Sequence, residues 1–306
     1  MQCFKSAQRQ ECSLYMASTF TFDAIGTSWT IDIPETLSSL KEESVLRLIQ
    51  ERIAIYDRTY SRFRKDSIVS AMALRAGVYE LPEDSLELFA LYREMYDVTK
   101  GKVTPLIGDT LVSLGYDALY SLQRQEEIVT PRPWDSVCSY APYCMTMHVP
   151  ALLDIGAGGK GYLVDIIGRL VEMEGIDSYT IDAGGDMLHK SARSQPLRVG
   201  LEDPRDSTCV VGVADVINGS VCGSAGNRRA WEGVHHIVDP FSGASPTEIV
   251  ATWVFARTAF LADMLATALF FVPPETLMPH YDFSFVSMYA DGTCLPSPHA
   301  PVTLYV

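Results

Sequence analysis

The chain has 306 residues, of which 47% are hydrophobic and 20% are charged. This is the composition of an ordinary globular protein, and it excludes a disordered or collagen-like chain. There are 24 Lys and Arg residues against 38 Asp and Glu residues, so the net charge is −14. A surface this acidic argues against nucleic acid or an anionic membrane as the main partner, because both attract basic proteins.

The seven cysteines form no C-x-x-C pair, and an odd number does not indicate a disulfide framework. We therefore expect free thiols and a reducing, cytoplasmic location. Residues 1–20 are polar and charged, so no signal peptide is predicted. The uncharged apolar run 264–272 is shorter than the ~20 residues that cross a bilayer, so we expect no membrane span. We expect one domain over residues 1–306, with residues 1–18 peripheral to it.

The first half of the chain contains both strand and helix patterns. Alternating apolar residues predict a strand pair over 20–33, interrupted at Gly26-Thr27. Residues 35–58 and 82–98 carry apolar side chains at helical spacing and predict two helices. The residues expected to face inward in the second helix are Leu86, Phe89, Ala90 and Tyr96.

The second half of the chain has more strands than helices. Two helices are predicted, over 162–174 and 258–271, the second being the most apolar. The predicted strands cover 144–149, 151–155, 179–181, 197–201, 209–217, 235–238, 283–289 and 302–306. Helices and strands mix without strict βαβ alternation, which favours an α+β fold with a mixed sheet.

A glycine cluster is the strongest local signal. Gly156, Gly158 and Gly161 fit G-x-G-x-x-G between a predicted strand and a predicted helix, where glycines let the backbone approach a phosphate. Asp182 follows at the position of a ribose-binding carboxylate in a dinucleotide-binding fold. However, no second βαβ half follows, and the motif also fits a plain turn. Asp154 precedes the glycines and should have a specific donor, because a buried unpaired carboxylate is costly.

A second group of oxygens lies in the apolar helix near the C-terminus. Asp263 and Thr267 are four residues apart, which places both side chains on one helix face. A carboxylate in apolar surroundings should be paired or bound to a metal. Together with a backbone carbonyl, these are hard donors that suit Mg²⁺. The alternative is that Asp263 caps the helix or faces solvent.

Two further segments carry side chains suited to chemistry. His235 and His236 end a predicted strand before a turn at Asp239-Pro240. A histidine there could be a general base, a metal ligand or a hydrogen-bonded structural residue. Residues 61–67 combine basic and aromatic side chains that could stack on a nucleotide and pair with it. A solvated charged loop is the alternative for this segment.

The order of these segments resembles the FAD:protein FMN transferase family, also called the ApbE family, from about residue 22 to 275. The resemblance implies largely antiparallel sheets with packed helices, an ApbE-like fold, and a flavin site in a central cleft. The segments that carry it are 25–29 (IGTSW), 60–67 (YSRFRKDS), 99–105 (TKGKVTP), 153–162 (LDIGAGGKGY), 182–186 (DAGGD), 236–243 (HIVDPFSG) and 262–268 (ADMLATA).

The resemblance implies a specific reaction. FAD, bound with Mg²⁺, would be cleaved at its pyrophosphate, and FMN would be attached through a phosphoester to a Thr or Ser of an acceptor flavoprotein while AMP leaves. The metal would be held by the carbonyl of Ala157 and the side chains of Asp263 and Thr267. His236 would take the proton from the acceptor hydroxyl. The flavin or adenine contacts would fall on Ile25, Phe63, Val103, Thr104, Pro105, Asp154, Lys160 and Ile237.

The chain departs from the family pattern at three places, one of which is Ala266, where some members have a second carboxylate beside the metal. Val103-Thr104-Pro105 stands where the family usually has Phe-Asp-Pro, and 223–227 departs from Thr-Ser-Gly-Asp-Tyr. Three other functions therefore stay open. The first is a Mg²⁺-dependent FAD pyrophosphatase that uses water as acceptor, and the second is a non-catalytic FAD-binding protein. The third, an NAD-dependent oxidoreductase, rests on the glycine motif alone and predicts a parallel sheet with the glycines at its centre.

Overall fold

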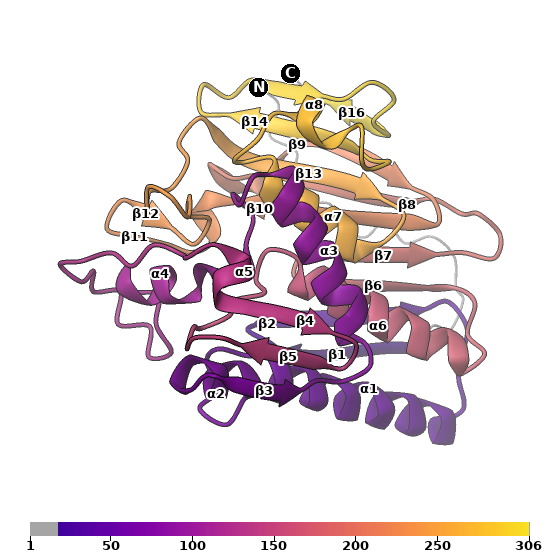
Figure 1. Cartoon of the computed structure of the whole chain (residues 1–306). Coiled ribbons are helices and arrows are strands. Elements are labelled where there is room, and N and C mark those ends of the chain that lie inside the picture. The colour runs from indigo at the N-terminus through magenta and orange to yellow at the C-terminus, as the bar shows by residue number, and fades with distance from the viewer. Residues whose placement is uncertain (1–17, 306) are drawn as a thin grey trace.

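The computed structural model describes residues 18–305, and its largest element is an eight-stranded sheet (Figure 1). In sheet order the strands are β1 (Ser18–Ala24), β2 (Thr27–Ile33), β6 (Tyr179–Ala183), β7 (Met187–Lys190), β10 (Gly219–Ala225), β13 (Ile249–Ala256), β14 (Ser284–Tyr289) and β15 (Cys294–Pro296). The largely antiparallel α+β fold is confirmed, because every strand pair in the described residues is antiparallel. The parallel sheet of an NAD-dependent oxidoreductase is therefore wrong for this chain.

Three smaller sheets complete the strand content. The first has the order β16-β9-β8, with β16 (Val302–Leu304), β9 (Asp206–Val216) and β8 (Leu197–Asp203). The second has the order β3-β5-β4, with β3 (Gly77–Glu80), β5 (Cys144–Met147) and β4 (Cys138–Ala141). The third pairs β11 (Ala230–Trp231) with β12 (Val234–His235).

The helices of the described residues are α1 (Ser39–Tyr60), α2 (Ile68–Leu74), α3 (Ser85–Val98), α4 (Gly108–Ser113), α5 (Trp134–Val137), α6 (Gly159–Met173), α7 (Ala259–Ala268) and α8 (Pro274–Leu277), with 3₁₀ turns η1 (Pro105–Ile107) and η2 (Gly226–Arg228). Among the helices, α6, α7 and α1 contact the large sheet, whereas α2 and α5 contact the small sheet β3-β5-β4. α6 and α7 pack against each other; α7 also contacts β10 and β13, and α6 contacts β6 and β7. In Figure 1, α4, β11 and β12 lie together at one side of the molecule.

Buried apolar side chains form three separate cores. The largest lies around α1, α3, α6 and α7, with Trp29, Tyr92 and Tyr162 among its fully buried members. The second joins the sheet β16-β9-β8 to β10, β13 and β14. The third is small and lies beside α4 and the β11–β12 pair; its buried members are Leu111, Leu114, Tyr116, Trp231 and Val238.

The predicted inner face of α3 is only partly right. Phe89 is buried and Tyr96 half-buried, but Leu86 and Ala90 are exposed. The residues that are buried on this helix are Ser85, Leu88, Phe89, Tyr92 and Met95. Several apolar residues satisfy helical spacing in this segment. The tertiary contacts, including that of Phe89 with Tyr60 at 6.4 Å between ring centroids, select the stripe that is buried.

Two of the predicted strands are not strands. Residues 151–155 are largely buried but outside any sheet, and the Asp154 N–H donates to the Pro105 carbonyl at 2.7 Å. Of the strand predicted over 235–238, only His235 lies in a strand, as the second residue of β12, after which the chain turns. In both segments the apolar side chains are buried, and Ile155, Ile237 and Val238 among them line the cleft.

The cysteines do not all behave as expected. Cys138, Cys144, Cys222 and Cys294 carry free thiols, whereas Cys209 is disulfide-bonded. Disulfides are uncommon in reducing compartments. The cysteines therefore do not by themselves support the expected cytoplasmic location. Among residues 18–305, no helix combines the length and apolar character that a membrane crossing needs.

Candidate active site

One large cleft brings together most of the residues named from the sequence. Its volume is about 1230 Å³, and it is lined by the glycine turn (156–159), the end of α1, α7, the segment 236–238 and parts of β8, β9 and β10. Every residue assigned from the resemblance lines this cleft except Pro105. Pro105 is buried behind the wall, where its carbonyl accepts the hydrogen bond from Asp154.

The oxygens of α7 face the glycine turn. Asp263 Oδ2 accepts a hydrogen bond from the Gly161 N–H at 2.9 Å, and Thr267 Oγ1 donates to the Ala157 carbonyl at 3.2 Å. Asp263 is buried and does not cap its helix, because Thr258 occupies the N-cap and accepts from the Leu261 N–H. A carboxylate, a hydroxyl and a carbonyl oxygen from two distant parts of the sequence thus lie at one end of the cleft.

The glycine motif allows this close approach. A Cβ at Gly161 would lie 2.2 Å from the Ala259 carbonyl oxygen and 2.7 Å from Asp263 Cβ. One at Gly158 would lie 2.8 Å from Met264 Cε. The structure therefore uses two of the motif's glycines to bring α6 and the turn before it against α7. Because the Gly161 N–H already bonds Asp263, it is not free to bind a phosphate.

The charges beside Asp263 are concentrated and buried. Asp186 is fully buried, forms an ion pair with Lys160, and leaves Oδ1 without a hydrogen-bond partner among the described residues. Burial, and then the nearby Asp186, raise the pKa of Asp263 well above its ordinary value. Burial opposes the charge of Lys160, but Asp186 and Asp263 outweigh it and raise the pKa of this lysine. Two carboxyl groups therefore share one lysine, an arrangement that further positive charge would stabilise.

Asp154 has the specific donors that the sequence predicted. Its carboxylate pairs with the Arg62 guanidinium and accepts from the Gly156 N–H at 2.6 Å. Arg62 also donates to the Tyr116 carbonyl at 2.7 Å and lies 4.2 Å from the centroid of the Phe63 ring. The Arg62 side chain is only 2% exposed. The segment 61–67 is therefore not a solvated loop throughout, although Arg64 within it is partly exposed.

The two adjacent histidines have different surroundings. His235 contacts the Pro246 carbonyl through Nε2 at 3.1 Å and the Ile237 amide through Nδ1 at 3.3 Å. His236 lines the cleft, and its Nδ1 is buried without a partner among the described residues. Burial and the nearby Arg229 lower the pKa of His236 to about 4, below the near-neutral value of an ordinary histidine.

Aromatic and turn residues form the remaining wall near Phe63. The Phe63 ring is stacked on Tyr120, with centroids 5.3 Å apart and planes 5° apart, and meets Tyr116 edge to face. Ile25 occupies the left-handed region at φ +44° in the β1–β2 turn. Thr104 caps η1 by accepting from the Leu106 N–H at 3.2 Å. The remaining lining residues assigned to flavin contacts, Val103 and Ile237, are buried side chains.

The sequence did not identify three residues that shape the site. Arg62 and Asp186 both lie in segments that attracted attention, but their partners are 92 and 26 positions away. Arg229 lines the cleft and donates to the Tyr116 hydroxyl at 2.9 Å. The signal that could have suggested Arg229 is the pair of basic residues at 228–229 shortly before the histidines.

The comparisons with known proteins identify the family. The family model described as "ApbE family" matches residues 25–282. Relatives named FAD:protein FMN transferase include one from Treponema pallidum, 30% identical over 74% of this chain and 70% of the relative. Another, from Escherichia coli K12, is 25% identical over 82% of this chain and 77% of the relative.

Solved structures have the same fold. A flavin transferase ApbE from Vibrio cholerae matches with a TM-score of 0.78 and 18% identity, over 92% of this chain and 97% of that one. The ApbE protein from Thermotoga maritima matches with a TM-score of 0.77 and 20% identity, again over 92% and 97%. Because the family model covers most of the chain and the fold agrees throughout, the chain belongs to the ApbE family.

Proposed function

We propose that this chain cleaves FAD and transfers FMN to a Thr or Ser hydroxyl of an acceptor protein, releasing AMP, with Mg²⁺ as the metal. The chain is a flavin transferase, as its family and its similarly named relatives indicate. The observation that carries the detailed proposal is the meeting of Asp263 and Thr267 with the glycine turn inside a cleft of about 1230 Å³.

The residues at this meeting point fit a magnesium ion. The described residues contain no cluster of three or more His, Cys, Asp or Glu side chains suited to a metal. The donors here are instead one carboxylate, one hydroxyl and one carbonyl, from Asp263, Thr267 and Ala157. Mg²⁺ commonly takes one or two carboxylates and completes its shell with water and phosphate oxygens. Bound there, it would stabilise negative charge on the diphosphate during transfer.

The chain's own side chains supply the other requirements. Lys160 lies at the same end of the cleft and would place positive charge beside the diphosphate. Phe63, Ile25 and Ile237 offer apolar surfaces for the rings of FAD. His236 is neutral near pH 7, so a ring nitrogen can take the proton from the acceptor hydroxyl. As the hydroxyl oxygen bonds to the FMN phosphorus, the bond to the AMP oxygen breaks and AMP leaves.

The test is incubation of the full chain with FAD, Mg²⁺ and candidate acceptor proteins, followed by mass spectrometry of the acceptor and assay of AMP. We expect the acceptor to gain one FMN residue, AMP to appear in equal amount, and EDTA to stop both. Asp263→Asn should abolish transfer, while circular dichroism shows a folded protein. Asp177→Asn, an exposed substitution outside the cleft, is the matched control and should leave the rate unchanged.

The other outcomes overturn defined parts of the proposal. AMP and free FMN without a mass gain on the acceptor would identify a pyrophosphatase that uses water. FAD binding without AMP release would identify a binding protein. Full transfer by Asp263→Asn would remove the metal assignment.

A further inference from the structure

The cleft has a second part that no flavin-site residue accounts for. Its wall there comes from β8 and β9, from the end of β10, and from η2 with the following Arg229. None of the residues assigned to FAD, to the metal or to the base lies in these elements. The cleft volume of about 1230 Å³ also exceeds the ~300–1,000 Å³ usual for small-molecule pockets. This part of the cleft is therefore a candidate site for a second partner.

β8 presents its edge to the cleft. In a strand, successive side chains point to opposite faces, so a strand that lines a cavity with one face contributes alternate residues. Val199 and Leu201 of β8 pack into the second core, whereas Arg198, Gly200 and Glu202 point to the other face. All five consecutive residues nevertheless line the cleft. In the sheet order β16-β9-β8, β8 has no strand on its other side among residues 18–305.

The end of β10 offers a second, shorter strand edge. β7 pairs with β10 only through Gly219, Ser220 and Val221. β13 continues along the other side of β10 as far as Ala225. Consecutive residues 223–225 line the cleft where β7 no longer covers them. An unpaired strand edge is a template for an added extended chain, through main-chain hydrogen bonds.

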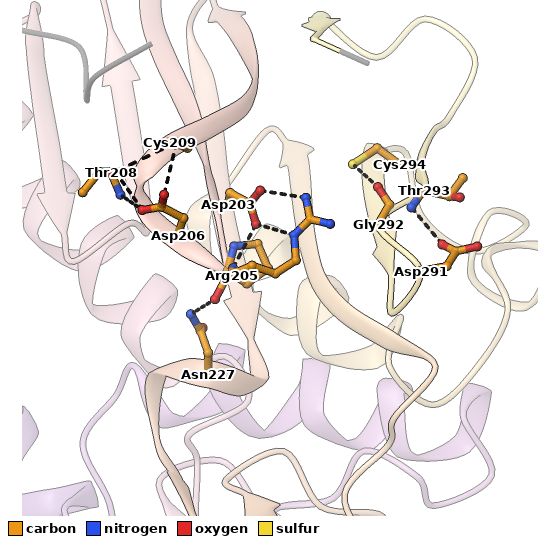
Figure 2. A network of polar contacts seen from close by, with 11 residues as sticks. Asp203, Arg205, Asp206, Thr208, Cys209, Asn227, Asp291, Gly292, Thr293 and Cys294 are labelled. Atoms are coloured by element: carbon orange, nitrogen blue, oxygen red, sulfur yellow. Dashed lines mark hydrogen bonds and ion pairs between the residues drawn. The ribbon is translucent and has the colours of Figure 1, made fainter. Parts of the chain in front are cut away.

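The β8–β9 hairpin is held firmly at its turn. Arg205 bonds Asp203 with Nε at 2.9 Å and Nη2 at 2.8 Å, as Figure 2 shows. Asn227 of η2 points at the same turn and donates to the Pro204 carbonyl (Figure 2). Beyond it, Arg228 pairs with Glu202 at 3.1 Å. These contacts fix η2, and the residues that follow it, relative to the edge of β8.

Positive charge is concentrated on this wall of an otherwise acidic protein. Arg198 and Arg229 are exposed, line the cleft, and pair with no carboxylate among the described residues. Arg229 is held by the Tyr116 hydroxyl, and its carbonyl accepts from the His236 N–H at 3.1 Å. A fixed guanidinium thus lies next to the histidine that would act as base. Arginine in such a position favours carboxylate partners.

We propose that residues 198–202 on the edge of β8 dock an extended, acidic segment of the acceptor protein. The segment pairs with β8 through its main chain and places carboxylates at Arg198 and Arg229, so that its Thr or Ser hydroxyl reaches His236. This inference rests on the proposed function, because it assigns the place where the acceptor of that reaction binds.

Hydrogen exchange of the full chain tests the pairing. The probe is an acceptor protein whose target Thr is changed to Val, which can bind but not react. We expect amides within 198–202 to exchange about tenfold more slowly with this probe, as hydrogen-bonded amides do. FAD alone should leave them unchanged. β16, at the other edge of the same sheet, is the internal control and should not respond.

Charge reversal tests the arginines. Arg198→Glu should raise the KM for the acceptor about tenfold, as loss of a charge pair does, while FAD affinity stays within about twofold. Arg229→Glu should also raise the KM for the acceptor. Arg193→Glu, exposed and outside the cleft, is the matched control and should behave like the wild type. An acceptor with Lys in place of its acidic residues should recover activity with Arg198→Glu.

Each other result has a defined meaning. Unchanged exchange in 198–202 with a bound acceptor overturns the docking site. Slower exchange of the 198–202 amides with FAD alone would assign this wall to FAD and also overturn the docking site. So would a loss of FAD affinity in Arg198→Glu as large as its rise in KM for the acceptor. If no acceptor ever gains FMN, the proposed function fails, whatever the hydrogen exchange of the β8 amides shows. If transfer occurs and β8 does not respond, the docking proposal alone fails.

Discussion

His235 and His236 are adjacent in the sequence, yet the backbone contacts both ring nitrogens of His235 and leaves Nδ1 of His236 without a partner among the described residues. His236 lines the cleft, and this Nδ1 is buried. The sequence could place both histidines at a turn, but it could not show which ring the backbone uses.

The surroundings of His236 predict the pH dependence of transfer. Because burial and Arg229 lower its pKa to about 4, the ring of the free enzyme is unprotonated throughout neutral pH. A general base must be unprotonated, so kcat/KM for FAD should stay level between about pH 5.5 and 8 when it is measured at a Mg²⁺ concentration that keeps Asp263 ionised. The anionic diphosphate should raise this pKa in the complex, so kcat should begin to fall at a higher pH than kcat/KM.

Steady-state rates with FAD and acceptor between pH 5 and 8 provide the measurement. His236→Asn should lower kcat on the order of 10²–10⁴-fold, while FAD affinity remains. A fall of kcat/KM centred near pH 6.5 would show that the ring titrates like an exposed histidine, contrary to this expectation.

At the scale of one element, α7 is held at its first turn by a residue of α6. Asp165 is buried and accepts hydrogen bonds from the Ala259 N–H at 2.9 Å and the Phe260 N–H at 2.8 Å. These amides would otherwise lack partners at the helix start. Gly161 lacks a Cβ and so lets α6 lie close against α7. Together with this close approach, the Asp165 contact fixes where Asp263 and Thr267 lie. Burial raises the pKa of Asp165 to about 6.

This raised pKa predicts how stability changes with pH. Between pH 4 and 6, the folded chain holds a proton on Asp165 that the unfolded chain has lost, so stability falls as pH rises. A difference between 3.8 and about 6 corresponds to about 3 kcal/mol at ~1.36 kcal/mol per pKa unit. Asp165→Asn removes this titration. At pH 4 the carboxyl of the unfolded chain is already more than half ionised. Urea unfolding at several pH values should therefore show the wild type losing about 2 kcal/mol relative to the variant between pH 4 and 7.

The control for this measurement is the exposed substitution Asp177→Asn, unfolded in urea at the same pH values. A stability difference between wild type and Asp165→Asn that is constant with pH would mean that Asp165 is already ionised in the folded protein at pH 4.

Elements with a clear local pattern could be predicted from the sequence. The pattern over 20–33 predicted the β1–β2 hairpin, because strand alternation and a turn glycine agree there. The predicted interruption at Gly26-Thr27 lies one residue after the observed turn at Ile25 and Gly26. The segments 151–155 and 235–238 are apolar for another reason, since their apolar side chains are buried although the chain there is mostly irregular. A short apolar run does not distinguish a strand from a buried connection.

At the scale of the whole molecule, the cleft draws residues from all three apolar cores. Ile155 reaches it from the first core, Leu201 and Trp253 reach it from the second, and Tyr116 reaches it from the third. The motifs predicted which segments meet here. The ion pairs between them could not be predicted, because Arg62 finds Asp154 only once tertiary packing has joined their segments.

Substitutions at the Arg62–Asp154 pair therefore test how much the contact between these two segments stabilises the fold. The two side chains are 2% and 12% exposed, and Arg62 also holds the Tyr116 carbonyl next to the third core. Arg62→Met leaves the carboxylate buried without its partner, which should cost about 3–5 kcal/mol of unfolding free energy in urea. Adding Asp154→Asn removes the unpaired buried carboxylate, so the double variant should be more stable than Arg62→Met alone. If Arg62→Met changed stability by less than ~0.5 kcal/mol, as surface substitutions do, the pair would not join these parts of the fold.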